Sequence, residues 1–125
     1  MTHSDAVKLA CVIISQYGGL ALTQTVGLFT DERGHKRRLG VPGTSDILAI
    51  MPGGKTLAVE IKTGRAVQSR VQRGFESAIA ARGADFVLAR FIDAASGDAA
   101  LREAISGLGY SSRIDIHAPQ LPIPG

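Results

Sequence analysis

The chain has 125 residues, of which 45% are hydrophobic and 20% charged, and its formal net charge is +3. This size and balance predict one domain with a core of its own, and they exclude a disordered chain. No apolar run reaches the roughly 20 residues of a membrane-spanning helix, and the first residues lack the basic segment of a secretory signal. We expect a soluble protein in the cytoplasm, without a membrane partner.

The predicted elements begin with a helix and continue as strands. In chain order they are a helix that starts at Ser4 and stops at Gly18-Gly19, a strand over 20–26, a polar turn over 30–35, a short approach over 39–43 and an apolar strand over 47–51. A minor additional strand near Lys36 is left open. The turn Pro52-Gly53-Gly54-Lys55 joins the strand over 47–51 to the next one, so these two strands predict a β-hairpin.

The second half of the chain alternates strands with helices. The predicted elements are a strand over 56–63, a helix over 67–82 with an apolar stripe of Val67, Val71, Phe75, Ala78 and Ile79, a strand over 85–90, a helix over 98–108 and an extended tail over 111–125. The expected fold is α/β or α+β, a single mixed sheet flanked by helices, with a core of about residues 4–108. The strands over 56–63 and 85–90 should be parallel, because a helix connects them.

Charged residues interrupt the apolar strand over 56–63. Side chains alternate along a strand, so Leu57, Val59 and Ile61 share one face, and Glu60 and Lys62 share the other. An ordinary exposed Glu–Lys pair would be the simplest explanation. Charges inside an otherwise apolar strand cost free energy unless they are used or paired, however, which favours a functional pair.

Asp46 lies at the far end of the preceding strand, about as far from the turn as Glu60. A two-residue turn at Gly53-Gly54 would place Asp46 opposite Ile61, and a register shifted by one residue would place it opposite Glu60. We expect the second register, because the two carboxylates can then share a cation. Their oxygens suit Mg²⁺ or Mn²⁺, and Lys62 would orient water or stabilise charge on a phosphate.

Gly43-x-x-Asp46, the hairpin, Glu60-Ile61-Lys62 and a helix with Gln72 together resemble the VRR-NUC family of the PD-(D/E)XK nuclease superfamily. The resemblance covers about residues 4–90. It implies a restriction-endonuclease-like αβββαβ core and a Mg²⁺- or Mn²⁺-dependent nuclease. It further implies that the substrate is branched DNA, such as a junction or flap, and that the protein is a homodimer.

The resemblance also assigns roles to individual residues. Asp46, Glu60 and the carbonyl of Ile61 would be metal ligands, Lys62 the catalytic lysine and Gln72 its support, with Gln68 a weaker candidate. The family often has a Glu on the first helix, and Asp5 stands at the matching position, where it could instead cap the helix. Two positions depart from the family pattern without removing a ligand: Thr25 replaces an Asn, and Ser45 replaces the proline of the family name.

Other residues support nucleic acid as the partner less directly. Two basic clusters are candidates for nucleic-acid binding: Lys36, Arg37 and Arg38, and Arg65, Arg70 and Arg73. Cys11 is expected to be a buried apolar residue, and His3, His35 and His117 are expected to be surface residues, since no pair has metal-ligand spacing. Two alternatives remain open: a non-catalytic nucleic-acid-binding domain that retains the fold, and an interaction module with coincidental charges.

Overall fold

The computed structural model describes residues 1–24, 27–39 and 44–113. Its elements are α1 (His3–Gln16), β1 (Leu20–Thr23), β2 (Gly27–Thr30), β3 (Lys36–Leu39), β4 (Ile47–Ile50), β5 (Thr56–Thr63), α2 (Arg70–Ala80), β6 (Asp85–Phe91) and α3 (Ala94–Gly107). The main sheet has the order β1-β4-β5-β6, in which only β5 and β6 are parallel. The expected mixed sheet with an αβββαβ core and a parallel β5–β6 pair is confirmed.

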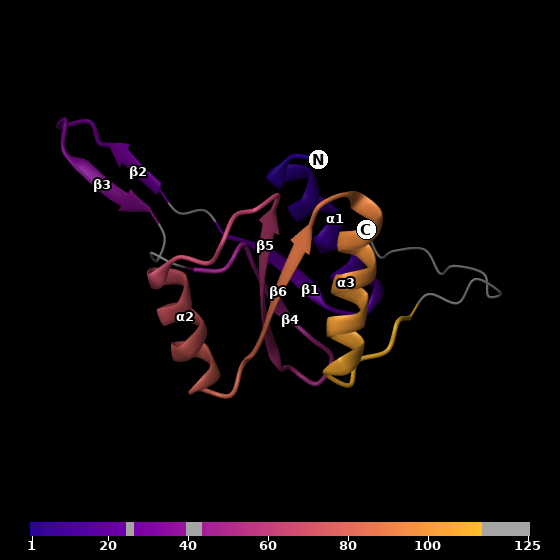
Figure 1. The fold of residues 1–125 in the computed structure, drawn as a ribbon. Coiled ribbons are helices and arrows are strands. Elements are labelled where there is room, and N and C mark those ends of the chain that lie inside the picture. Colours follow the sequence, from indigo (N-terminus) through magenta and orange to yellow (C-terminus); the bar gives the residue numbers. More distant parts are fainter. Residues whose placement is uncertain (25–26, 40–43, 114–125) are drawn as a thin grey trace, which may run out of the picture.

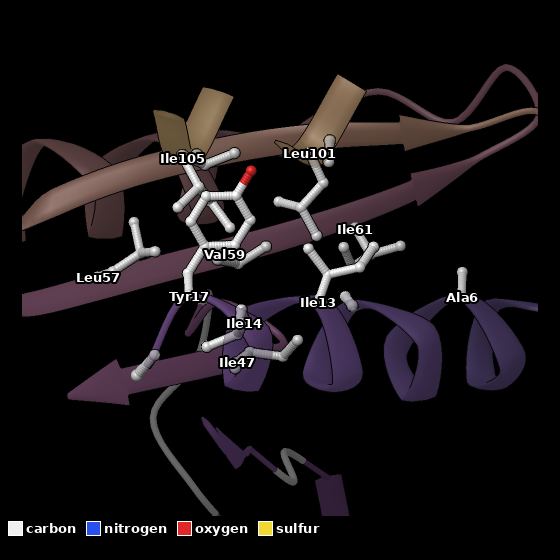
Figure 2. Close-up of a cluster of buried hydrophobic side chains, with 14 of the residues drawn as sticks. Ala6, Ile13, Ile14, Tyr17, Ile47, Leu57, Val59, Ile61, Leu101 and Ile105 are labelled. Carbon is white, nitrogen blue, oxygen red and sulfur yellow. The ribbon is translucent and has the colours of Figure 1, made fainter. Parts of the chain in front are cut away.

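Helices cover the two faces of this sheet unequally. α1 and α3 lie on one face and α2 on the other (Figure 1). The core lies between the sheet and the α1–α3 pair (Figure 2). Its fully buried side chains come from α1, β4, β5, β6 and α3, and include Ile13, Ile47, Val59, Phe91 and Leu101. The alternation predicted for β5 is therefore confirmed, with Leu57, Val59 and Ile61 in this core.

A second, two-stranded sheet lies between β1 and β4 in the chain. β2 and β3 pair antiparallel, with Thr30 opposite Lys36 and Gly27 opposite Leu39. The sequence leaves a strand near Lys36 as an open alternative, which β3 confirms, and it does not predict the partner strand β2. The predicted strand over 20–26 ends at Thr23, and residues 25–26 lie outside the described residues. Most of the predicted approach over 39–43 and of the tail over 111–125 also lies outside them.

The three helices start at residues that differ from those predicted. Thr2 rather than Ser4 caps α1, since its side chain accepts a hydrogen bond from the backbone N–H of Asp5. α3 starts at Ala94 instead of residue 98, because Asp93 and Ser96 form a reciprocal capping box. α2 starts at Arg70 instead of residue 67, because Ser69 and Gln72 form another. Capping satisfies the free N–H groups of the first turn, so it decides where a helix begins.

The apolar stripe predicted for α2 is wrong in part. Val67 precedes the helix, and Val71 and Ala78 are exposed, whereas Gln72, Phe75, Glu76 and Ile79 are half-buried. α2 covers the face of β5 that carries Glu60 and Lys62, so polar side chains are required on its inner side.

Two further expectations concern Cys11 and membranes. Cys11 is partly buried rather than fully buried, it packs against the core, and burial raises the pKa of its thiol. Among the described residues, no helix combines the length and apolarity that crossing a bilayer requires.

Candidate active site

The β4–β5 hairpin sets the distance between the two carboxylates of the motif, Asp46 and Glu60. Ile47 pairs with Val59, and the backbone N–H of Met51 donates to the carbonyl of Lys55 across a turn of three residues. Two of these, Gly53 and Gly54, have φ of 87° and 82°, a conformation that glycine adopts without strain. Continuing this register by one residue places Asp46 opposite Glu60, which is the second of the two predicted registers.

Asp46 is held from both sides. Its Oδ2 accepts a 2.7 Å hydrogen bond from the backbone N–H of Ile61, and its Oδ1 lies 3.2 Å from Nε2 of His3. Its own carbonyl accepts from the N–H of Gln24 at 2.9 Å. The preceding Ser45 is buried, and its hydroxyl donates to the carbonyl of Ile47. The carboxylate is thus fixed at the start of β4, yet the side chain of Asp46 remains 24% exposed and can reach a ligand.

Glu60 is buried without a partner. Its relative exposure is 1%, and neither carboxylate oxygen has a hydrogen-bond partner within the described parts of the chain. Burial raises the pKa of Glu60; nearby Lys62 lowers this pKa, and the carboxylates of Asp46 and Glu76 raise it. An unpaired buried carboxylate is costly, and a bound cation is one of the few groups that would compensate it.

Lys62 points at the start of α2. Its Nζ donates a 2.9 Å hydrogen bond to Oε1 of Gln72, and the same oxygen accepts the backbone N–H of Ser69 at 2.8 Å. Gln72 therefore completes the capping box of α2 and holds the ammonium group of Lys62 at once. This hydrogen bond holds the ammonium group of Lys62 beside the first turn of α2.

An open pocket of about 540 Å³ brings most of these residues together. Asp46, Lys62 and Gln72 line it, and the remaining lining residues are Gln24, Thr44, Ser45, Val67 and Ser69. Glu60 is not in this set, which agrees with its burial. The pocket is polar on most sides and offers both an ammonium group and a carboxylate to a ligand, so it fits a phosphate with a bound cation better than an apolar molecule.

The sequence missed two residues near this pocket. His3 was predicted to be an uninvolved surface residue, but it contacts Asp46. Only the fold brings the first turn of α1 to the start of β4. Glu76 was not singled out, although its carboxylate raises the pKa of Glu60 and accepts a 3.0 Å hydrogen bond from Nε2 of Gln68. Its spacing of one helical turn from Gln72 was the available signal.

The other predicted residues are not among those that line the pocket. Asp5 is exposed in the first turn of α1, and Arg65, Arg70 and Arg73 are exposed around the start of α2, where Arg73 donates to the carbonyl of Gln68. Lys36 is exposed on β3. Arg37 and Arg38 follow it in β3, with side chains outside the described structure. His117 also lies outside it, and His35 is exposed.

The donor set fits a hard divalent cation. Asp46, Glu60 and the carbonyl of Ile61 offer oxygens only, and a Mg²⁺ or Mn²⁺ ion bound by one or two carboxylates completes its shell with water and substrate phosphate. No three His, Cys, Asp or Glu side chains gather into a metal site in the part of the chain that the structure describes. The fit therefore rests on two carboxylates, of which Glu60 lacks any other partner.

Comparison with solved structures agrees with this geometry. One structure described as a VRR_NUC domain matches with a TM-score of 0.57 and 20% sequence identity, over 82% of this chain and 92% of that chain. The present chain has the VRR_NUC domain fold. No protein-family model matches the sequence, and no curated protein matches it.

Within this VRR_NUC fold, the candidate site occupies the two central strands of the main sheet. Asp46 comes from the start of β4 and Lys62 from the end of β5, and α2 closes the site from the face opposite the core. At 20% identity the likeness concerns the fold. Any chemical role of the site must therefore be argued from the side chains of this chain itself.

Proposed function

We propose that this protein is a metal-dependent nuclease that hydrolyses phosphodiester bonds in DNA. The observation that carries the proposal is Glu60, a fully buried carboxylate without a hydrogen-bond partner among the described residues. Its strand also carries Lys62, and the position opposite it holds Asp46. Burying a carboxylate without a hydrogen-bond partner costs stability, and a site for a cation and a phosphate would account for that cost. The VRR_NUC fold supports the same reading.

The residues of the chain would divide the work of hydrolysis. Asp46, Glu60 and the carbonyl of Ile61 would hold the Mg²⁺ or Mn²⁺ ion, which supplies Lewis-acid stabilisation of the phosphate and acidifies a water. Gln72 would hold Lys62 so that its ammonium group contacts the attacking water or a phosphate oxygen. The water would lose a proton to solvent as its oxygen forms the new bond to phosphorus. The bond between phosphorus and the leaving sugar oxygen would break, and that oxygen would take a proton from solvent.

Branched DNA is the substrate that we propose, cut by an endonuclease reaction. One domain of this size offers little surface to a junction, so a two-fold homodimer would hold it better and would present two sites to two strands. Apolar side chains on the α2 face of β1 and β4 support such a pairing. Leu20, Leu22 and Ile50 are 61%, 47% and 49% exposed, and Leu20 pairs with Ile50.

Cleavage assays test this function directly. The protein is incubated with labelled four-way junction, flap, duplex and single-stranded DNA in Mg²⁺, Mn²⁺ or EDTA, next to a folded Lys62→Ala variant. We expect metal-dependent cutting, with the junction or flap preferred, and its loss in Lys62→Ala. Binding without cutting under every condition would instead indicate a non-catalytic nucleic-acid-binding domain.

A further inference from the structure

The β2–β3 hairpin stands apart from the rest of the molecule. It extends outward from the body (Figure 1), and its two strands pack against each other but not closely against any other helix or strand of the described structure. It is inserted between Gln24 and Thr44 in the chain, and both of these residues line the candidate pocket. The hairpin therefore departs from, and returns to, the rim of the proposed active site.

The turn at the tip of this hairpin is closed by its own hydrogen bonds. The backbone N–H of Asp31 donates to the carbonyl of His35, and Gly34 donates back to Asp31 with a φ of 80°. The Oδ1 atom of Asp31 also accepts the N–H groups of Arg33 and His35 at 3.0 and 2.9 Å. A hairpin without a body to pack on needs such local bonds to keep one shape.

Positive charge is concentrated in the hairpin. Residues 27–39 contain four of the 14 basic residues and two of the 11 acidic ones, so they carry +2 of the chain's net charge of +3. One of the two acidic residues, Asp31, is engaged in the turn. Arg33, His35 and Lys36 are exposed. A projecting, basic and unpacked ribbon suits an anionic surface rather than an apolar one.

We propose that the β2–β3 hairpin is an arm that binds the phosphate backbone of duplex DNA next to the cleavage pocket. β2 and β3 have four residues each and form a two-stranded ribbon, an element that the major groove of DNA admits between its two phosphate backbones. This inference deepens the proposed nuclease function: the scissile phosphate would need a double-stranded flank on the side of the arm.

Equilibrium binding in EDTA tests the arm without requiring catalysis. The variant Arg33→Gln/Lys36→Gln removes two exposed charges from the arm, and Lys8→Gln/Arg82→Gln removes two exposed charges from α1 and from the residues after α2. Affinity for a fluorescent DNA duplex and for the corresponding single strand is measured at several salt concentrations. Circular dichroism confirms that each protein is folded.

We expect the arm variant to lose about 10-fold or more in duplex affinity, and its salt slope to fall by about 2, as two lost phosphate contacts require. The control should change much less, and single-strand binding should be less affected than duplex binding. Equal losses in arm variant and control, no loss in the arm variant, or a parent that does not bind duplex would each overturn the arm. If the arm results hold while the protein cuts nothing in Mg²⁺ or Mn²⁺, the arm stands and the nuclease function fails.

Discussion

The Nζ atom of Lys62 lies 2.9 Å from Oε1 of Gln72, and that same oxygen accepts the backbone N–H of Ser69. One side chain thus determines both the first turn of α2 and the position of the proposed catalytic lysine. A substitution of Gln72 should therefore lower both the stability of the fold, through the lost helix cap, and the activity, through the lost contact with Lys62.

Gln72→Ala removes the acceptor from both contacts. We expect unfolding free energy to fall by about 1 kcal/mol, as for the loss of a helix cap, and kcat to fall about 10- to 100-fold because Lys62 loses its support. Gln72→Glu is the matched control, since it keeps an acceptor at the same distance. Urea denaturation and steady-state kinetics on the preferred DNA check this, and unchanged kcat in a folded Gln72→Ala protein would contradict the role of Gln72.

Glu60→Gln should stabilise the metal-free protein. A buried carboxylate without a partner is penalised, so replacing it with a neutral amide is expected to raise the unfolding free energy by about 1–3 kcal/mol at neutral pH. The effect has a definite pH dependence. The folded protein, whose Glu60 pKa is raised by burial, holds this proton to higher pH than the unfolded chain, whose pKa is near 4.5.

The wild type in EDTA should consequently lose stability as pH rises from about 4.5 through the raised pKa of Glu60, relative to Glu60→Gln. Below pH 4.5 the carboxyl is protonated in both states and the two proteins should differ least. Denaturation at a series of pH values measures the difference. A gap between the proteins that does not grow with pH would argue against an unpaired buried carboxylate.

Metal should stabilise the wild type and not the ligand variants. Binding at 100 times the dissociation constant adds about 2.7 kcal/mol to the unfolding free energy, so Mn²⁺ should raise the melting temperature. Asp46→Asn and Glu60→Gln should lose this rise, whereas Glu103→Gln, an exposed change on α3, should keep it. Thermal melts in Mn²⁺ and in EDTA measure this difference in melting temperature. An equal increase in all four proteins would mean that the ion does not bind at Asp46 and Glu60.

His3→Ala should weaken metal binding. His3 lies 3.2 Å from Asp46 Oδ1 and helps to fix a proposed ligand, and partners of metal ligands typically contribute about 10- to 100-fold to metal affinity. His35→Ala removes an exposed histidine from the hairpin turn and should leave the affinity unchanged. Mn²⁺ titration by calorimetry measures both variants, and equal affinity in the two would remove His3 from the site.

Gly97→Ala tests the packing of α3 on the sheet. A Cβ atom at residue 97 would lie 2.1 Å from the ring of Phe91, which is itself buried, so the helix or the ring must shift. We expect a loss of about 1–3 kcal/mol in unfolding free energy. Gly107→Ala in the same helix meets nothing within 4 Å and should be neutral or stabilising by up to about 1 kcal/mol. Urea denaturation compares the two variants. Similar stability would mean that the ring of Phe91 can move aside at little cost in free energy.

Local patterns in the sequence were sufficient for most elements of the main sheet. The alternation in β5 correctly separated the core residues Leu57, Val59 and Ile61 from Glu60 and Lys62, since side-chain direction in a strand follows directly from position. The glycines at residues 53 and 54 correctly marked the turn between β4 and β5. The same turn left two registers open, because sequence does not show how many residues a turn contains.

The sequence by itself therefore determined the type of sheet, the parallel β5–β6 pair and the acidic and basic residues of the proposed site, because strand periodicity and turn residues act over a few positions. Only the tertiary structure decided that His3 contacts Asp46, that Glu76 lies near Glu60, and that β2 pairs with β3 as an arm at the rim of the pocket. The first two contacts join residues that are distant in the chain, and the third depends on which elements the hairpin packs against. Such contacts follow from the closure of the whole fold and have no local signature.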